Sequence, residues 1–196
     1  MNKQLTSLVL AALVAPAAVL AGATPLSLQQ VNDAQQAWCD SLVNIAKTYA
    51  AGGDYKTVAG AVLSNQYNYD KGTVLFRPTL AFGDQTFRLD KEGAAAYFIG
   101  GNPKYPNDDG FALKPWVSCR YTNAGGDAGV LIDGDFAATM GNVFITDAKG
   151  NETVVDKFFL FKRGDDAKLR IIVHKSALPF KPNWSARRRA ALAGLY

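Results

Sequence analysis

Apolar residues recur at helical spacing in the first part of the chain. Between residues 27 and 51 an apolar side chain returns at every third or fourth position, and Gly52 and Gly53 follow. This spacing predicts an amphipathic helix that ends at the glycines. Its apolar face would consist of Val31, Ala34, Trp38, Leu42, Ile45 and Tyr49. Asp54 can then cap a second helix that runs to about Leu63.

A third helix is predicted over residues 91–99. Asp90 is a suitable N-cap for it, and a pair of glycines follows it. Before this helix, the short stretches 73–79 and 86–89 predict extended segments. After it, residues 102–114 are rich in proline, asparagine, aspartate and glycine, and therefore predict a loop.

The second half of the chain alternates between apolar and polar residues, as β-strands do. The predicted strands are 116–123, 128–132, 136–147, 152–163 and 168–177. Turn-forming residues at 148–151 and 164–166 separate the later ones. Helices followed by a run of antiparallel strands are typical of an α+β fold. A strongly curved, mostly antiparallel sheet with N-terminal helices packed on it forms an NTF2-like cone, and we expect that architecture with an internal pocket.

The N-terminus has the features of a bacterial secretory signal. Lys3 provides a positive charge, residues 8–20 are mostly apolar, and Ala21-Gly22-Ala23 offers a cleavage site between small residues. We expect cleavage near Ala23 and a periplasmic or secreted mature protein. The predicted division is a signal peptide at 1–23, one NTF2-like domain at 24–182 and a basic C-terminal tail at 183–196.

Composition narrows the classes of partner. The chain has a formal net charge of +4, and loss of Lys3 with the signal lowers it to +3. Arg187, Arg188 and Arg189 in the tail supply this excess, whereas a nucleic-acid-binding protein usually has a broader basic surface. We therefore expect no nucleic-acid partner, and no membrane association after signal cleavage.

Two cysteines, Cys39 and Cys119, remain in the mature chain. In an oxidising compartment such a pair can form a disulfide. The alternative is two buried free thiols, because the sequence does not reveal whether the two Cα atoms approach each other.

The candidate chemistry centres on the only histidine, His174. A single histidine excludes a zinc site built from several histidines of one chain. Strand alternation puts His174 on one face with Arg170, Ile172 and Ser176. Both His174 and Ser176 can then enter a pocket, although a histidine that is simply hydrogen-bonded near a strand end fits the same pattern.

Two more hydroxyls are candidates. Thr79 follows an apolar strand and Pro78, and Tyr97 lies among small residues on the third predicted helix. Each also has an ordinary structural interpretation, as a buried strand-end threonine and a packed tyrosine. The acidic pair Asp108-Asp109 is interpreted as a solvated turn rather than a metal site.

Several sequence blocks resemble the iota-class carbonic anhydrases, a family similar to the association domain of calcium/calmodulin-dependent kinase II. In order along the chain, the blocks are 74–79 (VLFRPT), 93–101 (GAAAYFIGG), 110–116 (GFALKPW), 140–147 (MGNVFITD) and 174–179 (HKSALP). The resemblance spans about residues 38–182. It implies an NTF2-like cone, and we expect the protein to form a homodimer or higher homo-oligomer.

The resemblance also implies a function and a site. It implies metal-independent hydration of carbon dioxide to bicarbonate, with no cofactor, by Thr79, Tyr97 and Ser176 with His174 beside them. His174 is the expected proton acceptor. The expected apolar lining for carbon dioxide is Phe76, Phe98, Phe144 and Phe159. The alternative is a non-catalytic domain that binds a small ligand or mediates association.

One departure from the family pattern bears on that alternative. The family typically ends His-His-Ser-Ser-Leu-Pro, whereas Lys175 and Ala177 here replace the second histidine and the second serine. If the first histidine and the first serine of the family ending take part in the reaction, the predicted site is complete. If the second histidine and the second serine take part, this chain lacks a proton carrier and a hydroxyl.

Overall fold

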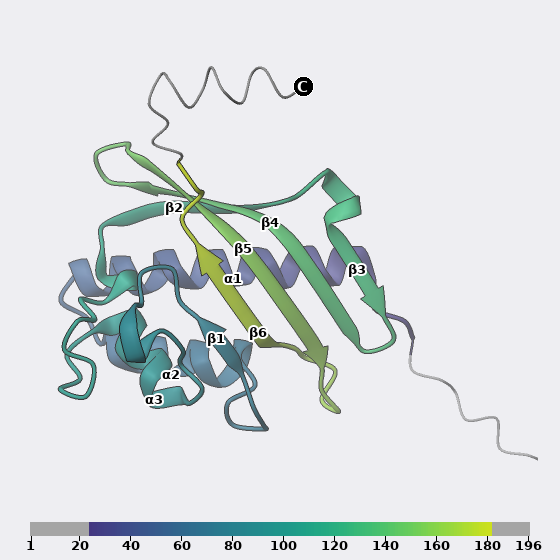
Figure 1. Ribbon diagram of the computed structural model, residues 1–196, viewed down its shortest axis with the longest axis horizontal. Helices are drawn as coiled ribbons and strands as arrows, with labels where there is room; N and C mark the ends of the chain where they lie inside the picture. Colours follow the sequence, from purple (N-terminus) through teal and green to yellow (C-terminus); the bar gives the residue numbers. More distant parts are fainter. Residues whose placement is uncertain (1–23, 182–196) are drawn as a thin grey trace, which may run out of the picture.

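The computed structural model describes residues 24–181, which form helices packed on one six-stranded sheet (Figure 1). The helices are α1 (Leu28–Ala50), α2 (Tyr55–Gln66) and α3 (Lys91–Ile99). The strands are β1 (Leu75–Arg77), β2 (Trp116–Asn123), β3 (Val130–Asp133), β4 (Phe136–Asp147), β5 (Glu152–Arg163) and β6 (Leu169–Ala177). The predicted α+β class is confirmed. The predicted signal peptide and the basic tail beyond residue 181 lie outside the described residues.

The three helices begin at the residues whose side chains can cap them. Ser27 and Gln30 form a capping box at α1, which accounts for its start. The carboxylates of Asp54 and Asp90 accept hydrogen bonds from the N–H groups of Thr57 and Gly93, as their predicted cap roles require. The end of α2 differs from the prediction, because the helix continues beyond Leu63 to Gln66.

The sheet brings together the first and last strands of the domain. Its order is β1-β6-β5-β4-β2, with β3 also paired to β4, and only the β1–β6 pair is parallel. Figure 1 shows α1 lying across one face of the sheet, with α2 and α3 near β1. Three predicted extended segments are shorter than expected: 73–79 is reduced to β1, residues 126–129 form a 3-10 turn before β3, and in 86–89 only Arg88 forms an isolated bridge, to Phe76.

A bulge in β6 changes the predicted alternation. Leu160 pairs with Val173 but Phe161 pairs with Ile171, so Ile172 is the additional residue between them. Ile171 consequently faces the core with His174, and the prediction that Arg170 shares the face of His174 is wrong. Ile172, predicted on the same face, is the unpaired residue of the bulge and is half-buried. The guanidinium of Arg170 instead pairs with Asp166.

A disulfide joins α1 to β2. Cys39 and Cys119 are bonded, with their Cα atoms 5.1 Å apart, which decides between the two alternatives that the sequence left open. The bond anchors the long helix to the edge of the sheet opposite β1. Among residues 24–181, no helix has both the length and the apolar character needed to cross a membrane.

Candidate functional site

His174 and Ser176 lie on the inner face of β6, and both are buried. The imidazole Nε2 is 2.8 Å from the hydroxyl oxygen of Ser176. Lys175, between them, is exposed on the opposite face. The first member of each family pair therefore faces the interior, while the position occupied by Lys175 faces away from it.

The other nitrogen of His174 contacts a residue that the sequence analysis did not single out. Its Nδ1 is 2.9 Å from the hydroxyl of Tyr67, and that hydroxyl accepts a 2.9 Å hydrogen bond from Nε1–H of Trp38. Tyr67 is fully buried just after α2, and Trp38 belongs to α1. The histidine is therefore positioned by residues from regions far apart in the sequence.

The hydrogen-bond network also assigns the tautomer of His174. Trp38 can only donate, so the hydroxyl proton of Tyr67 has one acceptor among its hydrogen-bond partners in the described chain, Nδ1 of His174. The opposite tautomer would leave a buried O–H group without an acceptor. Nε2 consequently carries the proton. Burial holds the pKa of His174 well below its ordinary value, so the ring is neutral.

Lys157 is the second residue that the sequence analysis missed. Its Nζ lies 2.8 Å from Nε2 of His174 and 2.6 Å from the hydroxyl oxygen of Ser176. The side chain is buried, with Nζ 4.4 Å from the centre of the Trp38 ring, and burial lowers the pKa of the amine well below its ordinary value. A signal was present in the sequence: Lys157 interrupts the alternating apolar face of β5 between Val155 and Phe159.

Thr79 and Tyr97 form a second group. The Tyr97 hydroxyl lies near the Thr79 hydroxyl and the backbone N–H groups of Thr79 and Leu80. Burial raises the pKa of Tyr97 to about 12, and these neighbours oppose that rise. The Tyr97 hydroxyl is nevertheless buried and forms no direct hydrogen bond with the rest of the described chain. A polar group placed between the Tyr97 and Thr79 hydroxyls would give the Tyr97 hydroxyl a hydrogen-bond partner.

The two groups are neighbours rather than one hydrogen-bonded cluster. The Phe76 ring stacks on His174 with centroids 4.4 Å apart, and it meets the Tyr97 ring edge-on at 5.7 Å. Arg77 donates hydrogen bonds to the backbone carbonyls of both Ser176 and Thr79. Within residues 24–181, no side-chain hydrogen bond joins Thr79 or Tyr97 directly to His174 or Ser176.

Three of the four predicted aromatic residues surround this region. Phe76 and Phe159 contact the His174 ring, and Phe98 stacks on Phe76. The prediction for Phe144 is wrong, because its side chain lies on the outer face of β4 with the Arg120 guanidinium 3.7 Å from its ring centre. The side chains around His174 are therefore mostly apolar, with a few polar groups among them.

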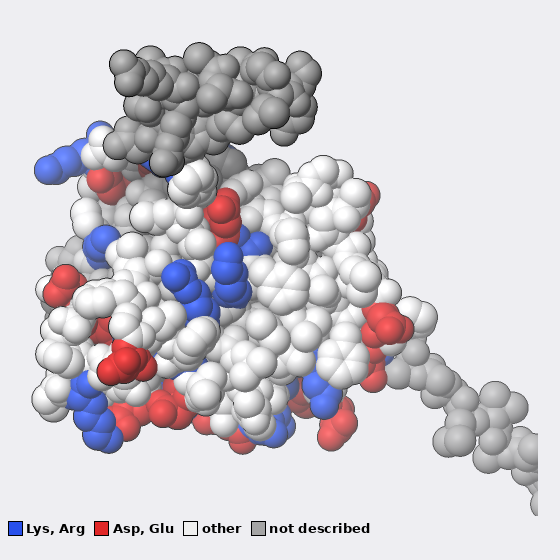
Figure 2. Space-filling model, viewed as in Figure 1, with Lys and Arg blue, Asp and Glu red and all other residues white. Residues whose placement is uncertain are grey.

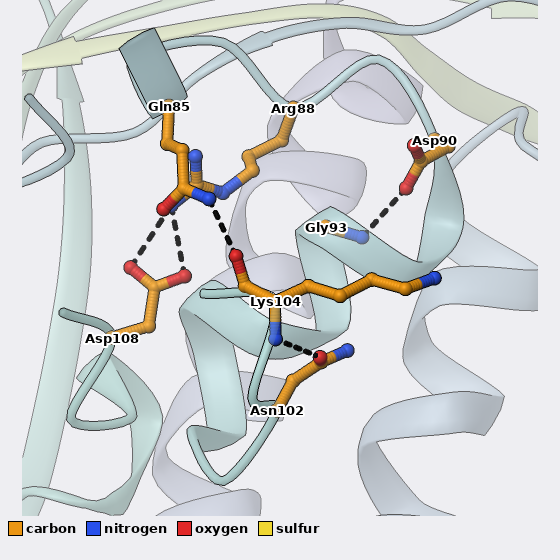
Figure 3. A network of polar contacts seen from close by, with 7 residues as sticks. All are labelled: Gln85, Arg88, Asp90, Gly93, Asn102, Lys104 and Asp108. Atoms are coloured by element: carbon orange, nitrogen blue, oxygen red, sulfur yellow. Dashed lines mark hydrogen bonds and ion pairs between the residues drawn. The ribbon is translucent and has the colours of Figure 1, made fainter. Parts of the chain in front are cut away.

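A buried ion pair supports the helix that carries Tyr97. Arg88 Nη2 donates to both carboxylate oxygens of Asp108, at 3.0 and 2.8 Å, and both side chains are buried (Figure 3). The interpretation of Asp108 as a solvated turn residue is wrong for this reason; Asp109 is exposed. Arg88 also limits Gly93, where an added Cβ would lie 3.0 Å from the arginine Cδ and 2.6 Å from the Tyr105 hydroxyl.

In the described part of the chain, no three histidine, cysteine, aspartate or glutamate side chains gather in a way that could hold a metal ion. The groups around His174 are an amine, hydroxyls and aromatic rings. This donor set contains no carboxylate or thiolate and does not fit a resident divalent metal.

Comparison with known proteins identifies the family. Residues 29–178 match the family described as metal-independent carbonic anhydrase. The chain belongs to that family. A metal-independent carbonic anhydrase from Nostoc sp. (strain PCC 7120 / SAG 25.82 / UTEX 2576) is 46% identical over 154 residues, which cover 78% of this chain and 73% of the Nostoc protein.

Solved structures agree with this family and with its fold. The iota-carbonic anhydrase from a cyanobacterium, solved in complex with bicarbonate, is 44% identical with a TM-score of 0.77, covering 81% of this chain and 95% of its own. The calcium/calmodulin-dependent protein kinase II association domain from Xanthomonas campestris is 16% identical with a TM-score of 0.51, covering 84% of this chain and 94% of its own, and shares the fold alone. The predicted NTF2-like architecture is confirmed.

The buried amine makes stability depend on pH. The pKa of Lys157 is lower in the folded chain than in the unfolded one, so between these two values the unfolded chain binds one more proton. The free energy of unfolding should then rise with pH, by about 1.4 kcal/mol per unit from this group. Urea unfolding between pH 7 and 9 measures the slope, and Lys157→Met should remove it.

Tyrosines limit this rise at higher pH. Burial raises the pKa values of Tyr69, Tyr97 and Tyr121, so above about pH 9.5 the unfolded chain loses phenolic protons that the folded chain retains. Stability should therefore pass through a maximum near pH 9.5. A flat profile from pH 7 to 9 in the wild-type protein would contradict a neutral Lys157.

Proposed function

We propose that this protein hydrates carbon dioxide to bicarbonate without a metal, using Thr79, Tyr97, Ser176 and His174. The observation that carries the proposal is the buried Tyr97 hydroxyl, which has no hydrogen-bond partner within residues 24–181 and lies beside Thr79, close to the buried His174 region. Family membership supports the same reaction, and the cyanobacterial relative was solved with bicarbonate, the product of that reaction.

The chemistry follows from the groups available. Carbon dioxide is apolar, so the rings of Phe76, Phe98 and Phe159 offer it a favourable environment. A water oriented by hydroxyl groups can attack the carbon atom. The hydroxyls of Thr79 and Tyr97, with the backbone N–H groups near them, can donate hydrogen bonds to the negative charge that develops on the oxygens.

The departures at positions 175 and 177 do not weaken this proposal. Lys175 is exposed, and the residues proposed to act, His174 and Ser176, face inward.

We infer that His174 does not accept the proton of the reaction, although its ordinary pKa would suit that role. Since Nδ1 accepts the Tyr67 proton and Nε2 already carries a proton, the ring has no free lone pair with which to accept another.

Stopped-flow measurement of carbon dioxide hydration on residues 24–196 tests the proposal. We expect a rate well above buffer that persists after dialysis against a chelator. A rate equal to buffer would instead favour the alternative of a non-catalytic ligand-binding or association domain. Loss of activity with the chelator, and its return with a metal, would contradict the metal-independent reaction.

We also propose that the protein forms a homodimer or higher homo-oligomer through the outer face of its sheet. Leu131, Phe136 and Met140 are exposed there, on β3 and β4, and Figure 2 shows an area with few charged side chains over these strands. A contiguous apolar surface is typical of protein contacts. Light scattering after size exclusion should give at least twice the protomer mass, and Met140→Asp should reduce it.

Export is the proposed location. The Cys39–Cys119 disulfide supports it, because disulfides persist in oxidising compartments. Mass spectrometry of a periplasmic or culture fraction should find a mature chain that begins at Thr24. An intact N-terminus in the cytoplasmic fraction would contradict this location.

A further inference from the structure

Three polar atoms at the centre of the site lie within hydrogen-bond distance of one another. Lys157 Nζ, His174 Nε2 and the Ser176 hydroxyl oxygen are separated by 2.6 to 2.8 Å. The neighbours of Lys157 include Trp38 of α1 and Phe159 of its own strand, and Lys157 forms no ion pair within the described chain. This is an unusual environment for a lysine, because a buried ammonium ordinarily has a carboxylate beside it.

The tautomer of His174 indicates which form of Lys157 fits. Nε2 carries a proton, so an ammonium 2.8 Å away would place two donors against each other. A neutral amine removes the conflict, because it has lost the proton that would point at Nε2 and its lone pair can accept from the Ser176 hydroxyl. Burial acts in the same direction on the amine.

One arrangement of protons then gives both Nε2–H and the Ser176 hydroxyl an acceptor. Nε2–H of His174 donates to the Ser176 oxygen, and the Ser176 hydroxyl donates to the lone pair of Lys157. One lone pair of the Ser176 oxygen remains free for a proton from a water molecule. Lys157 thus provides a vacant proton site next to Ser176, which His174 does not.

We propose that Lys157 is the proton acceptor of the hydration step and acts through the Ser176 hydroxyl. This role rests on the proposed carbon dioxide hydration. Lys157 does not touch the substrate, so it positions Ser176 and stores the proton, and Ser176 is the group that contacts the reacting water.

The proposed step forms one C–O bond and moves two protons. The water oxygen bonds to the carbon of carbon dioxide, and one C=O electron pair moves to its oxygen. The water O–H bond breaks, its proton passes to Ser176, and the Ser176 proton passes to Nζ of Lys157. Bicarbonate and a buried ammonium result. After bicarbonate leaves, the ammonium returns its proton through Ser176 to an entering water and then to buffer, which regenerates the neutral amine.

Replacement of Lys157 with amine rescue tests this role. Lys157→Ala and Lys157→Met should each lower the hydration rate about 100-fold, as loss of a general base does. Methylamine should restore the alanine variant about tenfold, in proportion to its unprotonated form, because the truncated side chain leaves space for it. It should not restore the methionine variant, whose side chain fills that space. Protein-free blanks correct for reaction of the amine with carbon dioxide.

Controls separate this role from folding and from the proposed function. Lys162→Ala removes an exposed lysine from the same strand and should leave the rate unchanged. If the alanine variant does not fold, the methionine variant still tests the role, because wild-type activity in it would overturn the proposal. Loss in both folded variants without any amine rescue would also overturn it. An inactive wild-type protein would overturn the function and this role together, whereas equal activity of wild type and Lys157→Met would overturn the role alone.

Discussion

Ser176→Ala is expected to lower the rate of carbon dioxide hydration about 100-fold or more while the protein remains folded. The reason is that the Ser176 hydroxyl lies between the buried His174 and Lys157 and is proposed to contact the reacting water. Loss of one positioned hydrogen-bonding group in an active site typically costs a factor of 10² to 10³. Stopped-flow assays at several pH values measure the effect.

The neighbouring residue supplies a matched control. Lys175→Ala changes the adjacent position of the same strand, but its side chain is exposed on the opposite face. This variant should keep the wild-type rate. If Lys175→Ala lost activity and Ser176→Ala did not, the second member of each family pair would be the working residue, and the proposed site would be wrong.

Asp108→Ala is expected to lower the free energy of unfolding by about 3 to 5 kcal/mol. The change leaves the Arg88 guanidinium buried without its carboxylate, and removal of one partner from a buried ion pair is costly. Two further nitrogens of Arg88, Nε and Nη1, already have no hydrogen-bond partner in the described structure. Urea unfolding followed by circular dichroism measures the loss.

Two variants control for this effect. Asp109→Ala removes an exposed carboxylate from the next position and should change stability by less than about 0.5 kcal/mol. Arg88→Met combined with Asp108→Leu removes both charges and should recover most of the lost stability. Similar unfolding curves for Asp108→Ala and Asp109→Ala would show that the ion pair does not stabilise the loop.

The neutral form of Lys157 lowers the stability of the protein but is needed for its proposed activity. A neutral amine in the interior reduces stability at neutral pH, because the unfolded chain regains the charged form. The proposed reaction needs that same neutral amine as a proton acceptor. A destabilising group at a functional site is consistent with the general trade between stability and activity.

Much of the local structure could be predicted from the sequence. Asp54 and Asp90 begin α2 and α3 because a carboxylate next to a helix start can accept from free N–H groups. The bounds of β2, β4 and β5 follow from alternation and turn residues. These features depend on neighbours within a few residues, so the chain carries them locally. The blocks around Thr79, Tyr97 and Ser176 also predicted the family correctly.

Other features depended on contacts between distant segments. The bulge at Ile172 reversed the alternation on one side of β6, because pairing with β5, rather than the local pattern, sets the register there. Asp108 became a buried ion-pair partner because the loop folds back onto Arg88. Phe144 faces outward, since a residue's side of the sheet depends on where the helices cover it.

The sequence by itself determined the helix caps, the α+β class, the family and the presence of one histidine with hydroxyls as candidate chemistry. Only the tertiary structure decided that Cys39 bonds to Cys119, that His174 is held by Tyr67, and that Lys157 completes the network. The physical reason is the distance along the chain between the residues that determine each feature. Caps and alternation reflect the geometry of adjacent residues, whereas the charge and proton arrangement of a buried group depend on whichever distant side chains exclude water from it.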